Sequence, residues 1–292
     1  MRKMLMIVKI AITILVAFVG ISEAAVNTYV SVLPQKYFVN AIGGERVKVS
    51  VMVAPGASPA TYEPKPKQMV DMSKTDIYFS IGVPFEKTWL KKLAALNRNM
   101  AVVATDEGIK KRTVEAHTHN DEHTDGNEHG GSKDPHIWLD PVNVIKQAEI
   151  ITETLCRADP DGCPIYKNNK ADFIKKTSLL HNQIQHTLSG ASGGSFMVFH
   201  PSWGYFADRY GLNQIAVELE GKEPKPSDLK DFVKLSKELN LKTIFAQPQF
   251  SKKTVELIAK ETGTKVAAVD PLAYDWADNL IYVSELIADS LR

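Results

Sequence analysis

The sequence predicts an α/β fold of two similar lobes, each built on a mostly parallel sheet and joined by one long backbone helix. Short β-branched runs alternate with helical segments in the first half of the chain, and a second series of the same kind fills the other half. A helical stretch without glycine or proline separates the two series. Alternating strands and helices favour parallel sheets with helices on both faces.

The first series predicts an N-terminal lobe over residues 25–165. Its β-branched runs indicate strands, and apolar residues at three- and four-residue spacing indicate helices. Strands are expected at 27–33, 47–53, 76–81 and 100–104, and helices at 35–42, 65–73, 85–96 and 141–157.

A connecting helix is expected over residues 166–190. The residues that recur on one face of its main part, 167–188, are apolar: Phe173, Ile174, Leu180, Ile184 and Leu188. Six serine, glycine and alanine residues at 189–194 then end the helix.

The second series predicts a C-terminal lobe over residues 191–292. Pro226 is typical of a helix start and Gly263 of a helix stop. Strands are expected at 195–199, 214–219, 242–246 and 265–269, and helices at 202–210, 226–239, 252–262 and near 278–291.

Residues 1–24 have the features of a cleavable signal peptide. Basic residues precede an apolar run at 10–21, and Ser22-Glu23-Ala24 places small residues where signal peptidase reads, so cleavage is expected after Ala24. A membrane anchor is the alternative, but the apolar run is short of the ~20 residues that a spanning helix needs. No cysteine lies nearby for a lipid anchor. We expect a soluble periplasmic protein.

The charge balance gives no indication of a polyanionic partner. The full chain has 35 basic and 34 acidic residues; without Arg2, Lys3, Lys9 and Glu23 of the signal peptide, 32 and 33 remain. This near-neutral balance gives no reason to expect nucleic acid or an anionic membrane surface as a partner. The remaining 268 residues make two domains of ordinary size plausible.

The chain has two cysteines, Cys156 and Cys163, on either side of a Pro-Asp-Gly turn. In an oxidising compartment such a pair predicts a disulfide that closes a small loop. A pair of soft metal ligands is the alternative, which the absence of further cysteines disfavours.

A polar loop at residues 115–133 is rich in histidine. Between Ala116 and Ile137 there is no apolar residue, so this segment cannot contribute to a core and is expected to be solvated. Imidazole and carboxylate groups bind divalent metals, which predicts an accessory metal-binding loop. An inert polar linker is the alternative. The loop histidines are His117, His119, His123 and His129.

Three further residues lie where a binding site is expected. Ligands of open α/β sheets bind beyond the carboxyl ends of the strands. His200 and Asp270 each follow a predicted strand, and His136 precedes a short apolar run, IWL. Singly, each histidine could be structural and Asp270 a turn former before proline. Together, they predict a site in the cleft between the lobes.

At this point the chain resembles the periplasmic metal-binding proteins of ABC importers, specifically the zinc-uptake (ZnuA) type of the manganese/zinc cluster. The resemblance extends over nearly the whole mature chain, in the family's order. The matching stretches are APGASPATYEPKP at 54–66, DPHIWLDP at 134–141, FHPSWGYFADRYGL at 199–212, EPKPSDL at 223–229 and VDPLA at 269–273.

The resemblance implies one Zn²⁺ held between the lobes and delivered to a membrane permease by a protein that is not an enzyme; we expect a monomer. His136 and His200 match the family's histidine ligands, and Asp270 matches its carboxylate ligand. Manganese-specific relatives more often have glutamate at the position of His200, so its nitrogen favours zinc over a manganese carrier.

Ala60 departs from the family pattern, which resembles GxxPHxYEP and has a histidine ligand at this position. Alanine offers no donor, so three alternatives remain open. Water or a loop histidine completes the site, Glu63 moves in, or the alanine weakens binding. Tyr62 and Glu63 are candidate supporting residues.

Two other function classes are considered beside the carrier. Three protein ligands plus water is the arrangement of a zinc hydrolase, but the chain has no HExxH pair. Its GxSxG match, at residues 190–194, follows the predicted connecting helix and not a strand, so it is not a nucleophile elbow. A metal-dependent adhesin is the third class, and the missing lipid-anchor cysteine counts against surface display.

Overall fold

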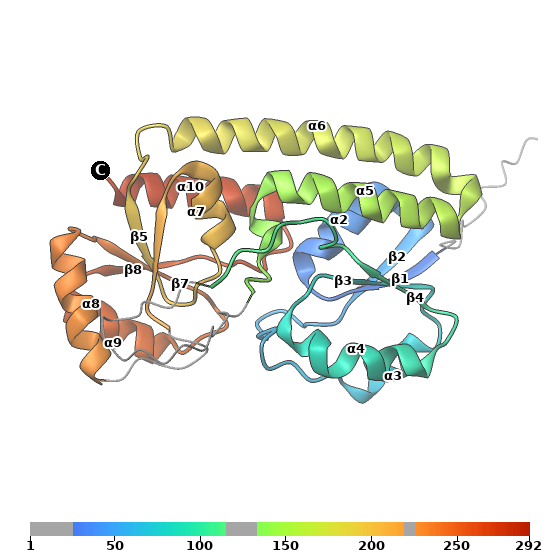
Figure 1. The fold of residues 1–292 in the computed structure, drawn as a ribbon, viewed down its shortest axis with the longest axis horizontal. Coiled ribbons are helices and arrows are strands. Elements are labelled where there is room, and N and C mark those ends of the chain that lie inside the picture. Colours follow the sequence, from blue (N-terminus) through green and yellow to red (C-terminus); the bar gives the residue numbers. More distant parts are fainter. Residues whose placement is uncertain (1–25, 115–132, 219–225) are drawn as a thin grey trace, which may run out of the picture.

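The computed structural model describes residues 26–114, 133–218 and 226–292. These residues form two four-stranded sheets, in the orders β2-β1-β3-β4 and β6-β5-β7-β8, and every pairing is parallel. Figure 1 shows them as two lobes side by side. The predicted fold class is therefore confirmed. The strands are β1 Val26–Val30, β2 Val47–Val51, β3 Ile77–Ser80, β4 Ala101–Ala104, β5 Ser195–Val198, β6 Asn213–Ala216, β7 Thr243–Ala246 and β8 Lys265–Ala268.

Helices cover both faces of each sheet (Figure 1). In the first lobe, α2 (Leu33–Gly43) and α5 (Pro141–Ala158) lie on one side, and α3 (Pro66–Met72) and α4 (Pro84–Leu96) on the other. In the second lobe, the corresponding helices are α10 (Trp276–Ser290) on one side and α8 (Pro226–Glu238) and α9 (Lys252–Thr262) on the other, with α7 (Gly204–Tyr210) beside the first lobe.

The long helix α6 (Cys163–Thr187) runs along both lobes and packs on α2, α5 and α10. It begins ahead of the predicted start, because Pro164 lies in its first turn, where a helix needs no backbone N–H. Prolines also lie in the first turns of α2, α3, α4 and α5. Gly263 ends α9 in the left-handed conformation, with a φ of 72°, as its position predicts.

One hydrophobic core continues from the first lobe into the second on the side of α6. Trp138 and Trp276 are fully buried in it and are tied by hydrogen bonds to the backbone. Trp276 Nε1 donates to the carbonyl of Trp138 at 2.7 Å, and Trp138 Nε1 donates to the carbonyl of Pro271 at 2.7 Å. Because the core and these bonds cross between the lobes, the segments that carry His136 and Asp270 are tied together.

A disulfide joins Cys156, near the end of α5, to Cys163 at the start of α6, as predicted. Beside it, Arg46 pairs with Asp159 through two hydrogen bonds of 2.8 and 2.9 Å. The Tyr166 hydroxyl and the Gly162 backbone N–H also donate to Asp159. These donors, Arg46 first, lower the pKa of Asp159 from 3.8 to about 2.

Asp159→Asn is expected to lower the melting temperature at pH 7 by on the order of 5 °C, because bonds to a charged acceptor are lost. A depressed folded-state pKa stabilises the protein above the unfolded value near 4 and loses that contribution as pH falls through about 2. Thermal unfolding at pH 7, 4 and 2 should therefore show the two proteins converging in acid. Asp161→Asn, an exposed change in the same turn, is the control, and an equal effect there would contradict the prediction.

The predicted division into lobes at residues 165 and 190 stays a prediction, as do the signal peptide and the histidine-rich loop, which lie outside the described residues. Across the described ranges, no helix has the length and apolar character required to cross a membrane.

Candidate metal centre

In the second lobe, the site lies at the point where the strand order of the sheet reverses. From β5, the chain places β6 on one side and β7 on the other, so the carboxyl ends of β5 and β7 flank the position where such sheets bind ligands. His200 follows β5 and Gln247 follows β7. The His200 backbone N–H donates to Gln247 Oε1 at 3.1 Å, and Gln247 Nε2 donates to the His200 carbonyl at 2.8 Å. Both bonds hold His200 at this edge.

His136 reaches the same place from the other direction. It lies just before a short 3-10 helix, Ile137–Leu139, whose side chains are buried. Asp134, which is fully buried, accepts from the His136 backbone N–H at 2.9 Å and is 2.7 Å from its ring Nδ1. The two histidine rings lie with their centroids 5.3 Å apart and their planes at 75°. The structure therefore brings two of the three predicted ligands together.

Each histidine is oriented by a carboxylate. His200 Nδ1 lies 2.7 Å from Glu218 Oε2, just as His136 Nδ1 lies 2.7 Å from Asp134 Oδ1. An ionised carboxylate only accepts hydrogen bonds, so Nδ1 of each ring must carry the proton. This arrangement leaves Nε2 of each ring as a lone-pair donor for a metal. A carboxylate on the second ring nitrogen is typical of the histidines of zinc sites.

Burial sets the charge of His136. Desolvation lowers the pKa of His136 below 6.5, although the neighbouring Asp134 opposes the shift. The pKa of Asp134 is also lowered: burial raises it, but the interaction with His136, including the hydrogen bonds that His136 donates, and the Arg112 charge outweigh that effect. At neutral pH the pair is thus an uncharged imidazole and a carboxylate, which is the state that binds a cation.

A cavity of about 20 Å³ lies between the histidines. That volume is close to what a single water molecule occupies, so the cavity accommodates one ion. Phe250 stacks on the His200 ring at a centroid distance of 5.0 Å and excludes water from that side. The lining residues come from both lobes: Ser58, Pro59, His136, His200, Gln249, Phe250, Pro271 and Leu272.

Asp270 does not join the two histidines in this conformation. Its Oδ1 accepts from Gln249 Nε2 and from the Leu272 backbone N–H, both at 2.9 Å. It lines a neighbouring cavity of about 60 Å³ that shares Leu272 with the first. Within the described part of the chain, no three histidine, cysteine, aspartate or glutamate side chains are grouped closely enough to hold a metal ion.

The structure also places the residues around Ala60, the position at which the sequence resemblance predicts a ligand. Ala60 is exposed and follows Pro59, a lining residue of the histidine cavity. Glu63 is exposed, and Tyr62 is buried against Phe85 with its hydroxyl 2.8 Å from Gln68 Oε1. Tyr62 thus packs in the core of the first lobe. His117, His119, His123 and His129 lie outside the described residues.

Sequence reasoning missed the orienting carboxylates. Asp134 stands two residues before His136 in the DPH motif, a local signal that could have found it. Glu218 lies just past β6, but the predicted strand extended to residue 219, so the strand-end rule that selected His200 did not select Glu218. Phe250 and Gln249 gave no signal, because their loop brings them to the site only in the folded chain.

The two parallel-sheet lobes and the paired imidazoles at their junction define a two-lobed binding protein with donors suited to a divalent metal. The chain belongs to the family described as zinc-uptake complex component A, periplasmic (ZnuA), whose family model matches residues 29–289.

Several known proteins are similar to it. The zinc-binding protein AdcA of Streptococcus pyogenes serotype M3 is 29% identical over 272 residues, covering 86% of this chain and 51% of AdcA. The zinc-binding lipoprotein AdcA of Streptococcus pneumoniae serotype 4 is 27% identical over 258 residues, covering 86% and 51%. The chain therefore spans about half the length of these curated relatives.

Solved structures agree more fully in length. A crystal structure of ZnuA has a TM-score of 0.83 and 40% identity, covering 91% of this chain and 99% of that one. A zinc-bound deletion mutant of ZnuA has the same TM-score and identity and covers 91% and 98%.

Proposed function

We propose that this protein captures Zn²⁺ between its lobes and delivers it to the membrane permease of an ABC importer. The observation that carries the proposal is the pair of carboxylate-held imidazoles, His136 and His200, facing one ion-sized cavity. Membership of the zinc-uptake family and the zinc-bound ZnuA neighbour support the same assignment.

Asp270 would supply the oxygen ligand. Asp270 follows β8, which belongs to the same sheet as β5, the strand before His200. Leu272 lines both the cavity beside Asp270 and the cavity between the histidines. To bind the metal, the Asp270 carboxylate would have to give up its hydrogen bond from Gln249. Two nitrogens and one carboxylate leave a fourth position of a tetrahedral site for water or another donor, because Ala60 cannot fill it.

Zinc is preferred to manganese because imidazole nitrogen suits zinc, whereas manganese favours oxygen-rich sites. A carrier is preferred to a zinc hydrolase because the chain has no HExxH pair and its family is described as a zinc-uptake component. The adhesin class has no support in the site itself: the laminin-binding relative Lmb is 24% identical, which establishes a common fold and no more.

Transport requires that the protein work outside the cytoplasm. We propose export through the predicted signal peptide, with cleavage after Ala24, into the periplasm. The description of the family as periplasmic supports this location. We also propose that the carrier acts as a monomer.

Competition with a chromophoric chelator, using metal-free protein, tests the zinc assignment. One ion should bind tightly at the histidine pair, and manganese should compete only at far higher concentration. Failure to bind zinc even at micromolar concentration would remove the proposal.

The histidine-rich loop is proposed as an accessory element that collects zinc for the cleft. Deleting residues 117–131 is expected to leave one tight ion while lowering the total number of ions bound, because the deletion removes four imidazoles. The zinc-bound ZnuA deletion mutant is a precedent for such a shortened chain. Calorimetric titration of both forms gives the two stoichiometries, and an unchanged total would contradict the loop's role.

A further inference from the structure

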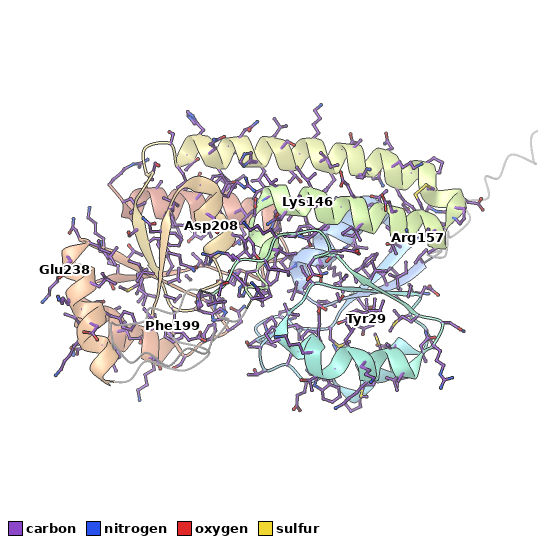
Figure 2. The ribbon with its side chains drawn as sticks, in the orientation of Figure 1. Tyr29, Lys146, Arg157, Phe199, Asp208 and Glu238 are labelled. Carbon is purple, nitrogen blue, oxygen red and sulfur yellow. A yellow bond between two sulfur atoms is a disulfide. The ribbon has the colours of Figure 1, made fainter. Side chains whose placement is uncertain are left out.

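Arg112 crosses from the first lobe to the second next to the metal centre. The coil that follows β4 carries it to α7, where Arg112 Nε is 2.9 Å from Asp208 Oδ2. Figure 2 labels Asp208 on α7, toward the middle of the molecule. The Arg112 backbone N–H also donates to the Tyr205 hydroxyl at 3.0 Å, and that hydroxyl donates to the Asp134 carbonyl at 3.1 Å. The arginine is therefore fixed at both its backbone and its side chain.

The same guanidinium reaches the carboxylate that orients His136. Arg112 Nη1 lies 3.3 Å from Asp134 Oδ2, while the other oxygen, Oδ1, faces His136 Nδ1 at 2.7 Å. The Asp134 side chain is fully buried and that of Arg112 is 14% exposed, so the contact is shielded from solvent. The two oxygens of one carboxylate are thus divided between an arginine and a metal-site histidine.

The backbone reinforces this arrangement. The Asp134 N–H donates to the Arg112 carbonyl at 3.0 Å, and Thr113 and Lys133 form an antiparallel bridge. Arg112, which precedes residues 115–132, and Asp134, which follows them, are therefore held opposite one another.

Gly204, the first residue of α7, leaves the space that the guanidinium occupies. A Cβ at this position would lie 1.5 Å from Arg112 Nη1 and 3.0 Å from Asp134 Oδ2. Its backbone φ is not in the left-handed region, so the requirement for glycine here is steric. Alanine would otherwise favour a helix.

We propose that Arg112 is a positioning residue for zinc binding: it holds the Asp134 carboxylate in the rotamer that keeps the proton on His136 Nδ1 and presents Nε2 to the ion. The proposal rests on the zinc-binding function proposed above. Without the guanidinium, Asp134 Oδ2 loses this partner, although Oδ1 still accepts from the His136 backbone N–H. The carboxylate is then held less firmly against the imidazole, so the ring takes its other tautomer more often and the lone pair points less steadily into the cavity.

If the role of Arg112 were purely structural, the residue would only hold the two lobes together. A second arginine–aspartate pair in the chain provides a matched control for that role. Arg209 on α7 pairs with Asp140 through bonds of 2.9 and 2.8 Å, so it too is an arginine that bonds to an aspartate of the 134–141 segment. Asp140 caps α5 at the Val142 N–H and has no contact with either histidine among the described residues. Arg209→Gln therefore removes a similar tie without touching the ligand.

The experiment compares Arg112→Gln, Gly204→Ala, their double variant and Arg209→Gln. By chelator competition, Arg112→Gln and Gly204→Ala should each weaken zinc binding about tenfold, the scale of losses when support for a ligand is removed. The double variant should lose less affinity than the two single losses combined, because the added methyl group at position 204 no longer meets a guanidinium, although it still lies close to Asp134 Oδ2. Arg209→Gln should bind within about twofold of the parent protein.

Nitrogen-15 NMR of the metal-free proteins supplies a second reading that needs no zinc. The parent and Arg209→Gln should show His136 protonated at Nδ1, whereas Arg112→Gln should show a mixture of tautomers. Unchanged tautomer and unchanged affinity in Arg112→Gln would overturn the proposal, as would equal losses in both arginine variants. If the parent protein binds no zinc, the zinc function fails separately, and the tautomer comparison still decides the role of Arg112.

Discussion

Ala60→His is expected to tighten zinc binding by about 100-fold, because it adds a fourth ligand where the site now has two imidazoles and one carboxylate at hand. Ala60 is exposed and directly follows Pro59, which lines the histidine cavity. The sequence resemblance predicts a histidine at this position, so we expect the local backbone to suit a ligand there. The added imidazole also takes the place of a water or a mobile donor, whose ordering opposes binding.

Competition against chelators of graded affinity measures the change. Ala60→Gln, which adds similar bulk without an imidazole, and Thr61→His, which moves the imidazole one residue along the same exposed loop, are the controls. Neither should gain more than a few-fold. If Ala60→His binds zinc no better than the parent protein, another group already occupies the fourth position, and a loop histidine becomes the first candidate.

His200→Ala is expected to weaken zinc binding by more than about 100-fold, since the loss of a ligand should exceed the 10–100-fold cost of losing only its supporting group. The substitution also leaves the buried Glu218 carboxylate, 4% exposed, without its imidazole partner. His136→Ala should have an effect of the same order. Measurement of zinc affinity together with melting temperature separates lost coordination from lost folding.

His186→Ala is the matched control for that loss. His186 is exposed near the end of α6, away from the cavity lining, so its removal should leave zinc affinity unchanged. A parent-like affinity in His200→Ala would mean that the tight site lies elsewhere, and the proposed function would then have to be relocated to the histidine-rich loop.

Much of the fold was predictable because its signals are local. Prolines at the first turns, Gly263 after α9 and alternating β-branched runs each act within a few residues, and the observed elements follow them closely. The disulfide was predictable for the same reason, since the two cysteines are seven residues apart across a turn. The differences between the predicted and the observed elements are small; for example, α6 begins at Cys163, ahead of the predicted start at residue 166.

The candidate site was predictable only in part. His136, His200 and Asp270 could be selected from strand-end positions and from motifs, but their distances depend on how two lobes pack. The structure places the two imidazoles together and leaves Asp270 bonded to Gln249 beside them. The groups that act on the histidines come from four separate segments, and no short-range pattern links those segments: Arg112, Asp134, Glu218 and Phe250.

The sequence by itself determined the two α/β lobes, the long helix, the disulfide and the histidines most suited to bind a metal. These depend on side-chain chemistry and on interactions between near neighbours. Only the tertiary structure decided which nitrogen of each ring is available, how large the cavity is and which arginine supports it. Those properties arise because packing joins groups that lie far apart in the chain. The pairing of β5 with β6 brings Glu218 to His200 over 18 residues, and the contact between the lobes brings the two imidazoles together.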